Sequence, residues 1–159
     1  LYSRGRDAVA ILTAFNALGA IVGSLLVMYT HKIKRKGVIV LYATLAYGFL
    51  LILFGWSTSI WIGIFALITL GAADAVGMTM RQTIVQLTTP DNMRGRATAA
   101  HSLAAMSANG IGKWEVGIMS DTIGAGDTMI LGGVVSIFVV LLIWYGLSGV
   151  RKYQYIEED

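Results

Sequence analysis

The sequence predicts an all-α fold, a polytopic membrane helix bundle. Of its 159 residues, 56% are hydrophobic and only 13% are charged, and the mean hydropathy is +0.70. A soluble globule of 17.1 kDa has too little interior to hide so many apolar side chains. The apolar residues also form five long runs, and about 20 helical residues cross roughly 30 Å of hydrocarbon. None of the runs alternates as a barrel strand would, so we interpret all five as transmembrane helices.

The five predicted helices differ in composition. The second and fifth contain no ionisable residue except tyrosine, which predicts wide contact with lipid. The first contains Asn16 and a Gly19-x-x-x-Gly23 pair, a spacing that lets a neighbouring backbone approach closely. The fourth is rich in small and polar residues, which predicts that it is buried among other helices. In chain order the helices cover approximately 8–30, 38–56, 60–87, 97–119 and 128–147, followed by a tail at 148–159.

Lys and Arg gather in alternate connections, which predicts the orientation. Lys32 and Arg35 lie in the first connection, Arg94 and Arg96 in the third, and further basic residues in the tail, whereas the second and fourth connections have none. The positive-inside rule therefore places the carboxyl terminus in the cytoplasm. The net charge of +3 does not indicate a nucleic-acid partner, because the basic residues end apolar runs and form no solvated face. The chain begins without a signal-like basic segment, which we interpret as the cut end of a longer protein.

Two charged residues interrupt the third predicted helix, and charges inside a bilayer usually mark functional sites. From Ile60, Asp74 lies ~21 Å along the helix, within the hydrocarbon, and Arg81 lies ~31 Å along it, near the cytoplasmic boundary. Their Cα atoms are ~10.5 Å apart along the axis, which is long for a direct salt bridge. Each is therefore expected to find its partner on another helix or in water. Two interpretations stay open: Asp74 binds a proton or cation while Arg81 meets an anion, or both are buried structural charges.

The fourth predicted helix carries two further charges towards its outer end. Lys113 and Glu115 are about 200° apart around the helix, so they point away from each other and cannot form a simple pair. Lys113 shares a face with Asn109. Either both charges meet partners inside the bundle, or Lys113 extends to the outer surface and only Glu115 is buried.

The sequence lacks the motifs of intramembrane hydrolases. It contains two histidines, no cysteine, no Gly-x-Ser-x-Gly and no His-Glu-x-x-His. We therefore predict no catalytic residue, no metal site and no cofactor. Charges inside the bilayer favour a protein that binds and moves a solute or an ion. A non-transporting membrane assembly or receptor subunit is the alternative, and it would not require charges on the helix faces that line a cavity.

Several motifs, in order, resemble the major facilitator superfamily of exporters. The segment from Asp74-Ala75-Val76 through Arg81-Gln82-Thr83 to Met93-Arg94-Gly95-Arg96 is similar to the tenth helix of these transporters and the cytoplasmic loop after it. Residues 6–26 resemble the eighth helix, and the stretch from Asn109 to Gly117 resembles the eleventh. Within the superfamily the resemblance is closest to the siderophore-exporter branch, typified by the enterobactin exporter.

The resemblance implies that the chain is helices 8 to 12 of a twelve-helix transporter in the bacterial inner membrane. Its partners would be the lipid bilayer, the missing amino-terminal helices, a siderophore or drug-like small molecule, and protons as the coupling ion. The mechanism would be alternating access. A five-helix piece should lack a closed path, so we expect no transport by this chain alone. The candidate residues for substrate or ion binding are Asn16, Asp74, Arg81, Asn109, Lys113 and Glu115, and those for the cytoplasmic gate are Lys32, Arg35, Asp91, Arg94 and Arg96.

Two positions depart from the pattern of the superfamily. His31 stands where an Asp often caps the next helix and helps to lock the gate, so the acidic partner of the basic run is missing. Lys113 stands where relatives tend to carry an acidic residue, which argues against proton coupling at that position. Two interpretations of Arg94 and Arg96 remain: they belong to the cytoplasmic gate, or they are ordinary positive-inside anchors.

Overall fold

The chain forms five long helices. The computed structural model describes the backbone of residues 2–30 and 35–146 and the side chains of residues 10–29 and 35–146. The all-helical prediction is confirmed, since this described part contains no strand. Lys32, His31 and the predicted tail at 148–159 lie outside it. The elements are α1 (Tyr2–Thr30), α2 (Lys36–Trp56), α3 (Ile60–Thr88), the short 3₁₀ turn η1 (Asp91–Met93), α4 (Arg94–Ile123) and α5 (Ala125–Gly146).

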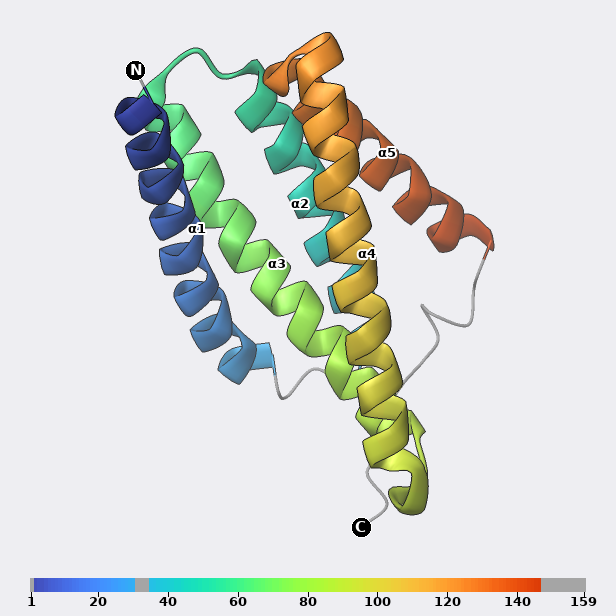
Figure 1. The fold of residues 1–159 in the computed structure, drawn as a ribbon. Coiled ribbons are helices and arrows are strands. Elements are labelled where there is room, and N and C mark those ends of the chain that lie inside the picture. Colours follow the sequence, from blue (N-terminus) through green and yellow to red (C-terminus); the bar gives the residue numbers. More distant parts are fainter. Residues whose placement is uncertain (1, 31–34, 147–159) are drawn as a thin grey trace.

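The helices run up and down in turn (Figure 1). α1 packs against α3, and α2 lies between α3 and α5. α4 crosses the front of the bundle and touches α3 and α5 over much smaller areas. The prediction of wide lipid contact therefore fits α5 better than α2, because α2 packs extensively against two helices, whereas α5 packs extensively only against α2.

Four of the five helices are long and apolar enough to cross a membrane, among the residues that the structure describes. The segments are Ala10–Tyr29, Lys36–Trp56, Ile60–Thr88 and Ala125–Gly146. α4 is long enough, with 30 residues, but it is not among these four. The small and polar residues of its first half lower its hydropathy, so composition alone does not identify it as a span.

Glycines bring α1 and α3 into backbone contact. A Cβ atom added at Gly19 would overlap the carbonyl of Ile68, and one added at Gly23 would overlap the carbonyl of Ala72. From the other side, Gly71 of α3 faces the carbonyl of Asn16. The close approach predicted from the Gly19-x-x-x-Gly23 spacing is therefore confirmed, and its partner is α3.

A second set of glycines joins α2 and α5, which run antiparallel. A Cβ added at Gly133 would lie 2.5 Å from the carbonyl oxygen of Gly48, and one at Gly126 would lie 2.9 Å from that of Gly55. The two glycines of each helix are seven residues apart, nearly two turns, so they share one face. The pairs hold the two backbones too close for any side chain between them.

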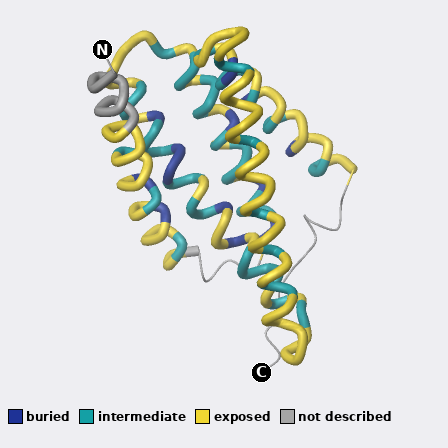
Figure 2. The backbone as a smooth tube through the Cα atoms, viewed as in Figure 1, coloured by how far each residue is buried: buried dark blue, intermediate teal, exposed yellow. Residues whose placement is uncertain are grey.

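α4 is the most exposed part of the bundle, contrary to the prediction that it is buried among other helices. None of its residues is buried, and Figure 2 shows it yellow along most of its length. A Cβ added at Gly110, Gly112 or Gly117 would meet nothing within 4 Å. The small side chains suit close packing, but the described elements provide neighbours on only part of the helix surface.

Exposed aromatic residues lie at both ends of the bundle. Trp56 ends α2 and Trp61 lies in the first turn of α3, at the end where these helices are joined, and both are exposed. Tyr29 and Tyr145 are exposed near the carboxyl ends of α1 and α5, at the opposite end. Trp and Tyr favour the two membrane–water interfaces, so this placement fits a bundle that crosses a bilayer.

Candidate functional site

The charged residues of α3 face a cavity of about 250 Å³ between four helices. Each helix contributes at least one polar side chain, and no loop takes part. The site therefore depends on how the helices pack, and the glycine contacts between α2 and α5 hold two of its walls together. The polar residues that line it are Thr44 and Tyr47 from α2, Asp74 and Arg81 from α3, Asn109 from α4 and Ser136 from α5.

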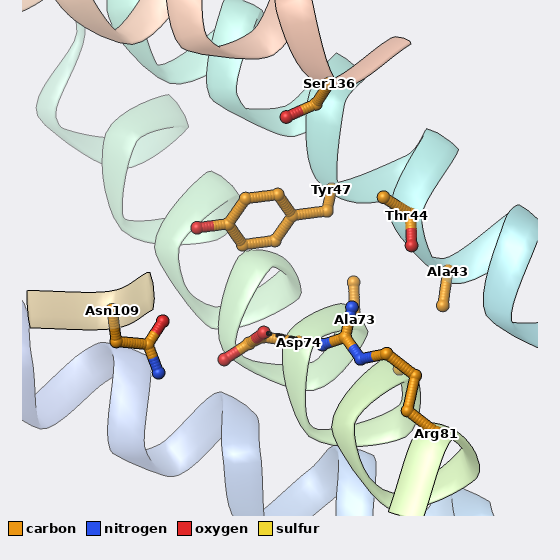
Figure 3. A pocket seen from close by; sticks show the side chains of 9 residues that line it. Ala43, Thr44, Tyr47, Ala73, Asp74, Arg81, Asn109 and Ser136 are labelled. Carbon is orange, nitrogen blue, oxygen red and sulfur yellow. Dashed lines mark ion pairs between the residues drawn. The ribbon is translucent and has the colours of Figure 1, made fainter. Parts of the chain in front are cut away.

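Asp74 and Arg81 form an ion pair, which corrects the prediction that they are too far apart for one. Oδ1 of Asp74 and one terminal guanidinium nitrogen of Arg81 are 4.0 Å apart. The axial distance between the Cα atoms overstated the separation of the charges, because side chains on a helix tilt towards its amino terminus. The long Arg81 side chain therefore extends back along α3 towards Asp74, as Figure 3 shows.

Neither member of the pair is buried within the described chain. The side chain of Asp74 is 62% exposed and that of Arg81 is 45% exposed. The expectation of a buried charge at Asp74 is therefore not met here, since the cavity is open on the side that no described helix covers. The carboxylate and the guanidinium lie along one wall of the same cavity and are accessible from it.

Two neutral polar groups face the ion pair from other helices. Figure 3 shows the ring of Tyr47 beside Asp74, with its hydroxyl directed towards the side of the cavity where the Asn109 amide lies. Asn109 was expected at a binding site, and the structure places it in the same cavity as Asp74 and Arg81.

Sequence reasoning missed Tyr47, Thr44 and Ser136. The signal that could have found them is their polarity within helices that are otherwise apolar. It does not show that the three face one cavity, because Thr44 and Tyr47 lie more than 80 residues before Ser136 in the chain and on a different helix. The hydroxyl of Thr44 donates a hydrogen bond to the carbonyl of Val40 at 2.8 Å, so only its acceptor positions remain for a ligand.

Three predicted binding residues lie outside the cavity. Lys113 and Glu115 are both exposed on α4, so within the described chain neither alternative is met: Glu115 is not buried, and the two charges do not lie inside the bundle. Asn16 has an exposed side chain and contributes its backbone carbonyl to the contact with Gly71. Of the predicted binding set, the structure therefore brings together Asp74, Arg81 and Asn109.

The corner between α3 and α4 is held by Arg94. One of its terminal nitrogens lies 2.6 Å from Oδ1 of Asp91, and its Nε donates to the carbonyl of Gln86 at 3.0 Å. That carbonyl belongs to the last turn of α3, where backbone acceptors lack helical partners. Arg94 therefore ties the end of α3 to the start of α4. Arg35, just before α2, and Arg96, in the first turn of α4, are exposed. The chain enters both helices from the same end of the bundle, because successive helices run in alternating directions (Figure 1).

Comparison with known proteins identifies a family. Residues 6–155 match a family model described as transmembrane secretion effector. No curated protein and no solved structure matches the chain significantly.

Proposed function

Because the chain belongs to the transmembrane secretion effectors, a family of the major facilitator superfamily, we propose that it works as part of a secondary active transporter that exports a siderophore or drug-like small molecule. The family points to a transporter rather than to an enzyme. The observation that carries the proposal is the Asp74–Arg81 pair, which lies on an apolar span and faces a cavity between four helices. Opposite charges in such a place mark a path for a solute or an ion.

The coupling ion in this proposal is the proton, and Asp74 is its carrier. A carboxylate that faces a cavity can exchange protons with whichever side of the membrane the cavity opens to. The guanidinium of Arg81 can attract an anionic group while Asp74 changes its protonation state. Alternating access would then open the cavity first to one side of the membrane and then to the other, with a different protonation state of Asp74 in each state.

The partner in this proposal is the rest of the same transporter, with α1 to α5 as its eighth to twelfth helices. The exposed α4 supports this assignment, because its small side chains suit a close neighbour and a Cβ added at any of its four glycines would meet nothing within 4 Å. With α4 counted as a fifth span, successive helices cross the bilayer in alternating directions.

The orientation we propose places the carboxyl terminus in the cytoplasm, in a bacterial inner membrane. Arg35, Lys36, Arg94 and Arg96 support it, because they lie at one end of the described bundle. The connection Ser57–Ser59 and the junction at Gly124, at the other end, carry no basic residue. At the basic end Arg94, with Asp91 and Gln86, would hold α3 and α4 at a fixed angle while the gate opens and closes.

Proton flux in liposomes tests the proposal. The full-length protein is reconstituted, an acid-inside pH gradient is imposed, and a pH-sensitive dye reports its decay on addition of siderophores and drug-like compounds one by one. We expect at least one compound to collapse the gradient faster than in protein-free liposomes. If no compound moved protons or crossed the membrane, the receptor or assembly alternative would replace transport.

A further inference from the structure

We propose that the Asp74–Arg81 cavity binds the zwitterionic head of a small molecule, with an ammonium group on Asp74 and an anionic group on Arg81. The inference rests on the proposed transport function and narrows its substrate to molecules that carry a positive and a negative group close together. It follows from three features of the cavity: unused hydrogen-bonding groups, balanced charge and small size.

The first feature is that the ion pair is incomplete. At 4.0 Å the two groups are beyond hydrogen-bond distance, and neither forms a hydrogen bond with the residues that the structure describes. By contrast, Arg94 and Asp91 approach to 2.6 Å. The guanidinium of Arg81 therefore keeps its donors, and the carboxylate of Asp74 keeps its acceptors. Groups of this kind are unfavourable at membrane depth unless a ligand, water or another helix satisfies them.

The second feature is that both signs of charge stand on one wall of the cavity. A ligand with only a cation would be attracted by Asp74 and repelled by Arg81, and a ligand with only an anion would meet the reverse. A zwitterion satisfies both groups, and it enters a site of zero net charge without adding charge to it. The flat fork of Arg81 matches a carboxylate or a phosphate, since both can accept two parallel hydrogen bonds from it.

The third feature is size, together with the neutral groups opposite. A volume of about 250 Å³ is slightly below the roughly 300–1,000 Å³ of sites that enclose a drug-sized ligand. The part of the cavity that the described helices line therefore suits the head group of a ligand. The hydroxyl of Tyr47 and the amide of Asn109 can donate to and accept from the remaining polar atoms of such a head (Figure 3).

Three probes of matched shape test the proposal. L-phenylalanine carries both charges, 2-phenylethylamine only the cation and 3-phenylpropionate only the anion. Binding of each is measured by calorimetry on the full-length protein in lipid nanodiscs at pH 7. We expect phenylalanine to bind at least ten times more tightly than either analogue.

Variants assign each charge to its partner. Arg81→Gln should lower the affinity for phenylalanine to that for phenylethylamine, and Asp74→Asn should lower it to that for phenylpropionate. Asp121→Asn removes a carboxylate of α4 that does not line the cavity, and it should leave all three affinities unchanged.

The comparison of probes on the unchanged protein decides the matter even if a variant fails to fold. A preference below tenfold, or no binding of phenylalanine at millimolar concentration, would overturn the proposal. The same preparation is assayed for proton flux with siderophores and drug-like compounds. Flux without zwitterion binding rejects the substrate class and leaves transport standing, whereas absence of flux with every compound rejects transport itself.

Discussion

Replacing Asp74 by Asn is expected to lower pH-gradient-driven export by the full-length transporter about 10- to 100-fold. Asn has nearly the same shape as Asp but cannot release or accept the coupling proton, and it leaves Arg81 without its opposite charge. Losing the charged group to which the exported molecule would form a hydrogen bond costs about 1.5–3 kcal/mol, which sets the size of the effect. The measurement is the initial rate of gradient collapse in proteoliposomes after addition of the exported compound.

The control for this variant is Asp121→Asn, which removes an exposed carboxylate outside the cavity. It should export at the normal rate. Equal export by the Asp74→Asn protein and the unchanged protein would show that Asp74 carries no coupling proton, and the proposed mechanism would be wrong.

Replacing Gly133 by Leu is expected to destabilise the bundle by about 3 kcal/mol or more, because the new side chain would have to displace the backbone of α2 at Gly48. Gly132 is its neighbour on α5, and a Cβ there meets nothing within 4 Å. Gly132→Leu should therefore change the stability by only about 0.5 kcal/mol. Replacing glycine by leucine raises the helix propensity equally at both positions. The difference in stability between the two variants therefore measures the cost of the overlap with α2. Thermal unfolding in detergent, followed by circular dichroism, measures it.

The two variants also distinguish close packing from a general effect of bulk in α5. If Gly132→Leu and Gly133→Leu lowered the unfolding temperature equally, the contact between α2 and α5 would not depend on Gly133. If neither lowered it, the two backbones could separate at little cost, and the walls of the cavity would not be fixed by this contact.

The sequence was sufficient to predict an all-helical membrane bundle and to single out Asp74 and Arg81. Both follow from local composition: long apolar runs require lipid, and a charge inside such a run is conspicuous. The pairing of the two residues was missed because helical rise gives only the distance between Cα atoms. The reach and direction of the Arg81 side chain decide whether the charges meet.

Contacts between helices could be predicted only in part. The Gly19-x-x-x-Gly23 spacing indicates that a helix approaches α1, but nothing in it selects α3. The antiparallel pairing of Gly48 with Gly133 depends on the register of two segments that are distant in the sequence. The position of Tyr47 in the cavity depends on the same register, so neither could be predicted from local sequence. For α4, small size and polarity indicate a need for neighbours, but they do not show whether those neighbours belong to this chain.

The central claim is that the cavity beside Asp74 and Arg81 is where the transported molecule binds, and protection of Asn109→Cys from alkylation tests it most directly. The chain contains no cysteine, so a single one can be placed at 109, which lines the cavity, or at 113, which is exposed outside it. Each variant is made in the full-length protein and labelled with a water-soluble maleimide in native membranes. The compound that collapses the pH gradient, at ten times its Kd, should slow labelling at 109 about tenfold and leave labelling at 113 unchanged. Equal labelling rates at 109 with and without the compound would contradict the account.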